Sequence, residues 1–261
     1  MPVTPVIVTN CTQRKCAVAQ INLAQLPHLR EVARLAEAWR SLVGATSPVA
    51  PARSLYQGRS ISDTVATAAY LEAQWYVVSA GLGLVRADQH VPAYECTVAA
   101  GSDLGSRLNL SGATSADWWG ALTAPDTHPL SRLIAKSPTL LALPSSYLYM
   151  IEDDLARVPA AKAGQLRIFT STAGVQFVPP HLAGCVMPYD DRLESVRTYA
   201  GTRADFAQRA LRHFVEALQA TPLSLDEART KVLAALAQLP QRRRPQGRRM
   251  PHDEVRRVLQ T

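Results

Sequence analysis

The sequence predicts an α/β protein with a mainly parallel sheet flanked by helices, followed by a C-terminal helical region and a basic tail. Short apolar runs rich in β-branched residues recur along the chain and are typical of buried strands. Segments with apolar residues at helical spacing separate these runs, and such alternation favours βαβ units. The chain has 261 residues, which is enough for one large domain with a proper core.

The predicted elements follow from these patterns in chain order. Strands are predicted over residues 3–9, 75–79, 139–143 and 166–170. Helices are predicted over residues 29–43, 61–73, 117–122, 128–135, 144–155, 202–218 and 223–239. We therefore expect an α/β core over residues 1–200, helices packed on it over residues 201–239, and a tail over residues 240–261.

Composition and charge limit the class of protein. No apolar run is long enough for a membrane helix, and the N-terminus lacks the pattern of a signal peptide, so a cytoplasmic location is expected. The four cysteines, Cys11, Cys16, Cys96 and Cys185, lack the CxxC spacing of structural zinc sites, and we expect neither a metal nor a cofactor. They are expected to be reduced thiols.

Ligands of parallel α/β sheets bind beyond the carboxyl ends of the strands. Here the segments that follow the first three predicted strands are residues 10–16, 79–94 and 144–146. All three carry polar side chains or glycines directly after a buried run. The sequence therefore predicts a working surface where the first two of these loops meet at one edge of the sheet, with the third nearby.

The first loop, residues 10–16, supplies a candidate nucleophile. Lys15 attacks a sugar or carbonyl carbon if burial or a neighbouring cation such as Arg14 lowers its pKa, and otherwise serves as a charge for a phosphate. Cys11 is a second catalytic candidate, although no histidine lies near it in the sequence. Asn10, Thr12 and Arg14 are predicted to contact the substrate.

The second loop, residues 79–94, supplies binding groups. Gly81 and Gly83 permit a tight turn and close approach of the backbone to a ligand. Ser79 and Tyr94 are predicted to bind substrate, the tyrosine by stacking or by a hydrogen bond. The glycine spacing differs from GxGxxG, so no dinucleotide site is expected.

A carboxylate is needed to stabilise positive charge that develops on a sugar. Asp88 is the catalytic candidate, and Glu95, Asp190 and Asp191 are alternatives that sequence alone does not separate. An alternative role for Asp88 is to cap a turn.

Two further groups are predicted around the site. Tyr56 and Arg59 lie in a short polar and aromatic patch, where the tyrosine stacks on a base and the arginine binds phosphate, or where an ordinary turn forms. Ser145 and Ser146 stand at a predicted helix N-terminus, which favours anions, although capping explains them equally well.

Basic side chains predict contacts to a nucleic-acid backbone. Arg203, Arg209 and Arg212 lie on or beside one predicted helix, and Arg243 and Arg248 lie in the arginine-rich tail. The net charge is +7, much of it in that tail, which suits a polyanion. A solvated helix face and a solubilising tail are the alternatives.

Three stretches together carry a resemblance to known proteins. They are Cys-Thr-Gln-Arg-Lys at residues 11–15, Leu-Tyr-x-Gly at residues 55–58, and Val-Ser-Ala-Gly-Leu-Gly-Leu-Val at residues 78–85, which continues to Pro-x-Tyr at residues 92–94. Their order resembles uncharacterised bacterial and phage-associated domains and, more loosely, YaaA-like proteins. The first stretch is similar to the core loop of archaeosine synthase-like proteins, in which a lysine works on a deazaguanine base. Asn10 and Cys16 stand where that loop has prolines.

The resemblance implies chemistry on a nucleic-acid base, in DNA repair, base modification or phage defence. We expect a DNA glycosylase or base transferase acting at the N-glycosidic bond, which flips its target base or uses single strands. Lys15 would attack the anomeric carbon or bind the base, and Tyr56, Tyr94 and Tyr147 would stack on the base. The alternatives are a DNA-binding protein without catalysis and a hydrolase or transferase of free nucleotides.

Overall fold

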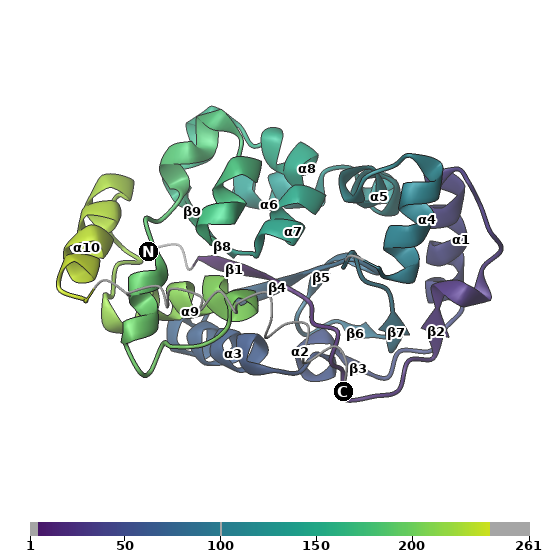
Figure 1. The fold of residues 1–261 in the computed structure, drawn as a ribbon, viewed down its shortest axis with the longest axis horizontal. Helices are drawn as coiled ribbons and strands as arrows, with labels where there is room; N and C mark the ends of the chain where they lie inside the picture. Colours follow the sequence, from purple (N-terminus) through teal and green to yellow (C-terminus); the bar gives the residue numbers. More distant parts are fainter. Residues whose placement is uncertain (1–4, 100, 241–261) are drawn as a thin grey trace, which may run out of the picture.

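The fold is built around a five-stranded sheet. The computed structural model describes residues 5–99 and 101–240 (Figure 1). The strand order is β5-β4-β1-β8-β9, where only β5 runs antiparallel to its neighbour. The strands are β1 (Val6–Asn10), β4 (Gln74–Ser79), β5 (Gly83–Arg86), β8 (Thr139–Ala142) and β9 (Leu166–Phe169). The predicted α/β class with a mainly parallel sheet is confirmed.

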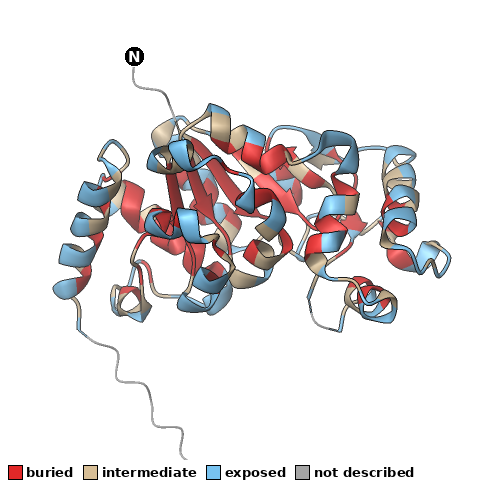
Figure 2. Cartoon of the chain, turned by 90° about the horizontal axis from the view of Figure 1, so that it is seen from above, coloured by how far each residue is buried: buried red, intermediate tan, exposed pale blue. Residues whose placement is uncertain are grey.

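Helices cover both faces of this sheet. Successive side chains of a buried strand point to opposite faces, so each central strand contributes to two cores. Ile7 and Val77 belong to the core beneath α3 and α9, and Val8 and Val78 belong to the core beneath α6, α7 and α8 (Figure 1). Figure 2 shows the strands buried and the outward faces of the helices exposed. Both faces of β1 are thus covered, which explains its unbroken apolar start.

The helices alternate with the strands along most of the chain. They are α1 (Val32–Gly44), α2 (Ala52–Leu55), α3 (Arg59–Leu71), α4 (Asp103–Ser111), α5 (Ser115–Leu122), α6 (Pro129–Lys136), α7 (Ser145–Met150), α8 (Glu152–Ala156), α9 (Phe206–Arg212) and α10 (Leu225–Ala237). Of these, α2 and α4 fall outside every predicted helix. Ser102 caps α4 by accepting a hydrogen bond from the amide of Gly105 at 3.0 Å.

Two short strand pairs fix the loops at the edge of the sheet. β2 (Ile21–Asn22) pairs in parallel with β7 (Tyr94–Glu95), and β3 (Ala50–Pro51) pairs antiparallel with β6 (His90–Val91). The segment predicted as one loop over residues 79–94 therefore contains β5 and β6. A tight turn at Gly81 reverses the chain from β4 into β5.

Two predicted helices are interrupted. The helix expected over residues 144–155 divides at Ile151 into α7 and α8. Pro144, not a serine, occupies the N-cap of α7, so the predicted serine cap is wrong. The helix expected over residues 202–218 consists of a 3-10 turn (Arg203–Asp205), α9 and a π-helical segment (His213–Ala217).

Some predictions reach beyond what the structure covers. Arg243 and Arg248, for which contacts to a nucleic-acid backbone are predicted, lie outside the described residues. Within residues 5–99 and 101–240, no helix combines the length and apolar character needed to cross a membrane.

Candidate functional site

The loop after β1 is held against two other segments. The amide of Cys11 donates to the carbonyl of Val78 at 3.0 Å, which joins the loop to the end of β4. Lys15 forms a β-bridge with Tyr56, and the amide of Gln57 donates to the carbonyl of Arg14 at 3.0 Å. Residues 10–16 thus lie against the end of β4, as the edge-of-sheet argument predicts, and also against the patch around Tyr56.

Lys15 lies at the centre of this arrangement. Its Nζ lies 4.5 Å from the ring centroid of Tyr94 and 5.9 Å from that of Tyr56. The same atom donates to the carbonyls of Thr12 and Gln13, each at 3.4 Å. Among the described residues, no carboxylate forms a salt bridge with it.

Burial lowers the pKa of Lys15 below its ordinary value. Desolvation disfavours the ammonium form, and it outweighs the opposing influence of Cys11, Cys96 and Glu95. A ring face attracts a cation, so Tyr94 offsets part of the burial cost. A larger fraction of Lys15 is therefore the neutral amine at neutral pH than for an exposed lysine.

A chain of buried hydroxyls positions the Tyr94 ring. Ser79 Oγ accepts the amides of Gly81 at 3.2 Å and Leu82 at 3.0 Å, which occupies both of its lone pairs. Its proton is therefore donated to Tyr94 Oη at 2.5 Å, and Tyr94 in turn donates to Tyr56 Oη at 2.8 Å. Burial raises the pKa of both phenols, which stay neutral.

This packing corrects one expectation about stacking. Tyr56 is 2% exposed and Tyr94 is 1% exposed, so neither ring offers a free face to a base. Gly81 has no room for a side chain, because an added Cβ would lie 2.5 Å from the Tyr94 ring. Ser79, Gly81 and Tyr94 therefore shape the wall behind Lys15.

Lys15 opens into a pocket of about 260 Å³, called the lysine pocket below. Its lining includes Cys11, Thr12, Tyr94, Cys96 and Tyr147. Pockets for drug-sized ligands span roughly 300–1,000 Å³, so this volume suits a single ring system. Burial raises the pKa of Cys96, whose thiol stays protonated.

Cys11 and Tyr147 form a polar pair in the lysine pocket. Cys11 Sγ and Tyr147 Oη lie 3.0 Å apart, and burial raises the pKa of the phenol. Tyr147 lies in the first turn of α7, next to Ser145 and Ser146, which do not line the pocket. The residue that follows the predicted third segment, Tyr147, thus contributes a partly exposed ring to the site.

Gln208 of α9 holds the loop after β1 in place, a role that the sequence analysis did not predict. Its Nε2 donates to Asn10 Oδ1 at 2.8 Å and to the carbonyl of Ala142 at 3.0 Å. Asn10 Nδ2 donates to the carbonyl of Cys11 at 2.8 Å. Asn10 therefore positions the loop and does not line the pocket, and nothing in the sequence connects it with a residue 198 positions away.

The structure places Asp88 away from Lys15. Asp88 follows β5 and lies beside the amino end of β4, because β5 runs antiparallel and Arg86 pairs with Tyr76. Its two oxygens accept from Arg86 at 2.7 and 2.5 Å, which lowers the pKa of the carboxyl. The carboxylate that lines the lysine pocket is Glu95.

Gly83 begins β5 with a φ of +73°, a turn position that favours glycine.

Most of the predicted phosphate contacts are engaged elsewhere. Arg209 is fully buried against Glu194 and Asp205, so the predicted backbone contact is wrong for this residue. Arg212 pairs with Asp63 and Glu216, and Arg59 donates to the carbonyls of Thr198 and Ala200. Arg203 and Arg14 are exposed. Neither residue lines the lysine pocket or the larger pocket that adjoins it.

Of the other predicted carboxylates, Asp190 has a local partner, whereas Asp191 is exposed, does not line the lysine pocket and forms no salt bridge among the described residues. Asp190 accepts from Arg192 at 2.7 Å and caps a 3-10 turn that begins at Asp191. No group of three His, Cys, Asp or Glu side chains within the described ranges is arranged to hold a metal ion.

Comparison with known proteins gives no assignment. No protein-family model, curated protein or solved structure matches this chain at a significant level. The resemblance that the sequence motifs suggest therefore stays a prediction, and any function must be argued from the site.

Proposed function

We propose that this protein is an enzyme that cleaves or exchanges the bond between a nucleobase and its sugar, with Lys15 as the nucleophile. The observation that carries the proposal is a half-buried amine with a lowered pKa at a pocket sized for one ring system. Lysines that act through covalent intermediates are activated in this way, by desolvation.

The proposed reaction has two stages. The Nζ lone pair attacks C1′, the bond from C1′ to the base nitrogen breaks, and the base leaves with its electron pair and takes up a proton. Nζ of Lys15 then forms an imine with C1′ as the C1′–O4′ bond breaks. O4′ receives the proton that Nζ gives up. Water, or a second base, completes the turnover and releases Lys15.

Other side chains have supporting roles in this proposal. Cys11 and Tyr147 contact the base, because both line the pocket and the tyrosine ring is partly exposed. Glu95 replaces Asp88 as the carboxylate that stabilises positive charge at C1′. The internal pairing of Arg209 and Arg212 removes support for binding DNA along α9.

Borohydride trapping tests the proposal. The full chain is incubated with nucleosides, nucleotides and single- and double-stranded oligonucleotides, and adducts are located by peptide mass mapping. We expect a reduced adduct on Lys15 that is lost in Lys15→Met, while Lys231→Met, which changes an exposed lysine of α10, keeps it. Asp88→Ala should also keep it.

The outcomes separate the candidates. Free base without an adduct would replace Lys15 by a water-using mechanism. Absence of both adduct and free base, with each variant folded as judged by circular dichroism, would reject the enzyme and leave a binding protein.

A further inference from the structure

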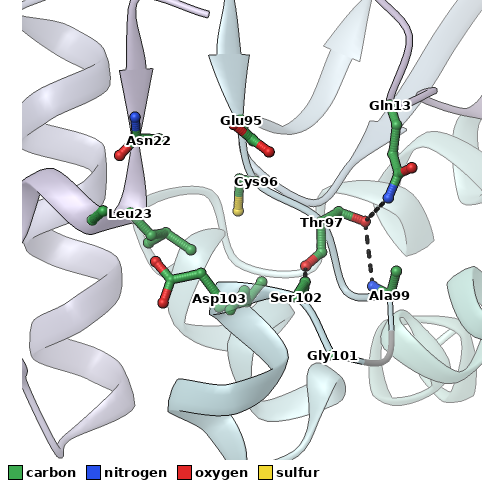
Figure 3. Close-up of a pocket in the computed structure, with 12 residues that line it drawn as sticks. Gln13, Asn22, Leu23, Glu95, Cys96, Thr97, Ala99, Gly101, Ser102 and Asp103 are labelled. Atoms are coloured by element: carbon green, nitrogen blue, oxygen red, sulfur yellow. Dashed lines mark hydrogen bonds between the residues drawn. The ribbon is translucent and has the colours of Figure 1, made fainter.

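A second pocket adjoins the lysine pocket, and is called the outer pocket below. It has a volume of about 560 Å³ and shares Gln13, Glu95, Cys96 and Thr97 with the lysine pocket. Figure 3 shows its walls, formed by the ends of β2 and β7 and by the segment that enters α4. The two pockets therefore share one wall, and a ligand attached at Lys15 would lie next to the outer pocket.

The walls of the outer pocket offer hydroxyl, amide and carboxylate groups. Asn22, Thr97 and Ser102 are neutral polar side chains, and Glu95 and Asp103 are exposed carboxylates. Among the described residues that line either pocket, Lys15 is the only basic side chain. Such a lining suits a sugar with free hydroxyls.

Arg107, which contacts two lining residues of the outer pocket, is committed to the fold. Arg107 Nε lies 3.2 Å from Asp103 Oδ1, and its other donors bind the carbonyls of Leu23 at 2.8 Å and Pro27 at 2.9 Å. The Arg107 side chain is 5% exposed, so its guanidinium group is not available to bind a phosphate through two hydrogen bonds.

The start of α4 is also closed to an anion. Ser102 Oγ already accepts the Gly105 amide, and Asp103 in the first turn places a negative charge at the positive end of the helix dipole. A phosphate in the outer pocket would meet the carboxylates of Glu95 and Asp103 without a free basic partner among the described lining residues.

We propose that the substrate is a free nucleoside, with its base in the lysine pocket and its unphosphorylated sugar in the outer pocket. This inference rests on the proposed function and narrows it, because a nucleotide or a DNA strand carries phosphate at the sugar hydroxyls. Glu95, which lines both pockets, is the residue that rejects the phosphate by like-charge repulsion.

Binding without turnover tests the inference separately from the chemistry. Full-length protein is titrated by calorimetry at low salt with each common nucleoside, its 5′-monophosphate and a short single-stranded oligonucleotide. We expect at least one nucleoside to bind about tenfold or more tightly than its 5′-monophosphate. Glu95→Gln should reduce that ratio several-fold and Glu95→Lys should reverse it. Glu72→Gln, an equal charge change beside Asp88 at the amino end of β4, should leave it unchanged.

Each outcome has a distinct meaning. Nucleoside preference without a borohydride adduct supports this inference and rejects the lysine nucleophile. Equal or tighter binding of monophosphates or oligonucleotides overturns the inference, while a Lys15 adduct with those ligands preserves the proposed function. Failure of all these ligands to bind overturns both.

Discussion

The hydroxyl oxygens of Ser79 and Tyr94 lie 2.5 Å apart, and this contact ties the last residue of β4 to the ring beneath Lys15. Because Ser79 also accepts two amides of the β4–β5 turn, the turn and the pocket wall form one unit. The position of Lys15 therefore depends on residues of three segments that are distant in sequence.

Tyr94→Phe should destabilise the fold while keeping the ring that faces Lys15. The change leaves the Ser79 hydroxyl and the Tyr56 hydroxyl without their buried partner, which costs about 1–3 kcal/mol. Urea unfolding measures the loss. Tyr70→Phe is the matched control, because Tyr70 is 55% exposed and its hydroxyl has only a 3.5 Å contact with Gln219. Equal stability of Tyr94→Phe and wild type would show that the hydroxyl chain contributes nothing.

Gly81→Ala should destabilise the protein and distort the lysine pocket. A Cβ at this position would lie 2.5 Å from the Tyr94 ring and 3.1 Å from Cys96 Cβ, so the wall must shift at a cost of about 1–3 kcal/mol. Gly120→Ala, in α5, has open space around the new methyl group and should gain about 0.5–1 kcal/mol. Thermal unfolding of the two variants should therefore move in opposite directions, and a shared direction would contradict the packing described here.

The pKa of Lys15 should lie below 10.5, and Glu95→Gln should lower it further, since the carboxylate favours the charged amine. Titration of the isotope-labelled Nζ by NMR measures both values. If the reaction needs the neutral amine, the pH at which the trapping rate is half-maximal should fall in the same variant. A rise of the Lys15 pKa in Glu95→Gln would contradict the proposed electrostatics.

The same shift has a consequence for stability. Because the folded state releases the proton of Lys15 at lower pH than the unfolded state does, the unfolded chain binds more protons between the two pKa values. The free energy of unfolding contributed by Lys15 should thus increase as pH rises from the folded pKa toward 10.5. Comparison with Lys15→Met over that window isolates the effect, and a difference that is independent of pH would exclude it.

The sequence anticipated the sheet because its central strands are buried on both faces and read as apolar runs. It also anticipated that the loop after β1 meets Tyr94, since the carboxyl ends of parallel strands share one edge. The sequence analysis misplaced Asp88 because it did not recognise β5, which is only four residues long. The turn at Gly81 reverses the chain into β5, and β5 carries Asp88 to the other end of the sheet.

Tertiary pairing decided the remaining differences. Arg209 and Arg212 have the spacing of a solvated basic stripe, and only their distant partners reveal that Arg209 is buried against Glu194 and that the partly exposed Arg212 is paired with Asp63. The link from Gln208 to Asn10 likewise joins elements that no local pattern connects. Tyr147 is a residue that the resemblance names as a stacking ring, and it lines the lysine pocket.

Arg209→Met should lower stability strongly, because it leaves the carboxylates of Glu194 and Asp205 without their buried partner. Arg209 Nη2 lies 2.7 Å from Glu194, and Nε lies 2.8 Å from Asp205. Breaking one side of a buried ion pair costs about 3–5 kcal/mol, which calorimetry or urea unfolding resolves readily. Arg203→Met changes an exposed arginine three residues before α9 and should stay within about 0.5 kcal/mol of wild type. If Arg209→Met instead kept its stability and lost affinity for nucleic acid, the arginine would be a surface contact and the packing of α9 described here would be wrong.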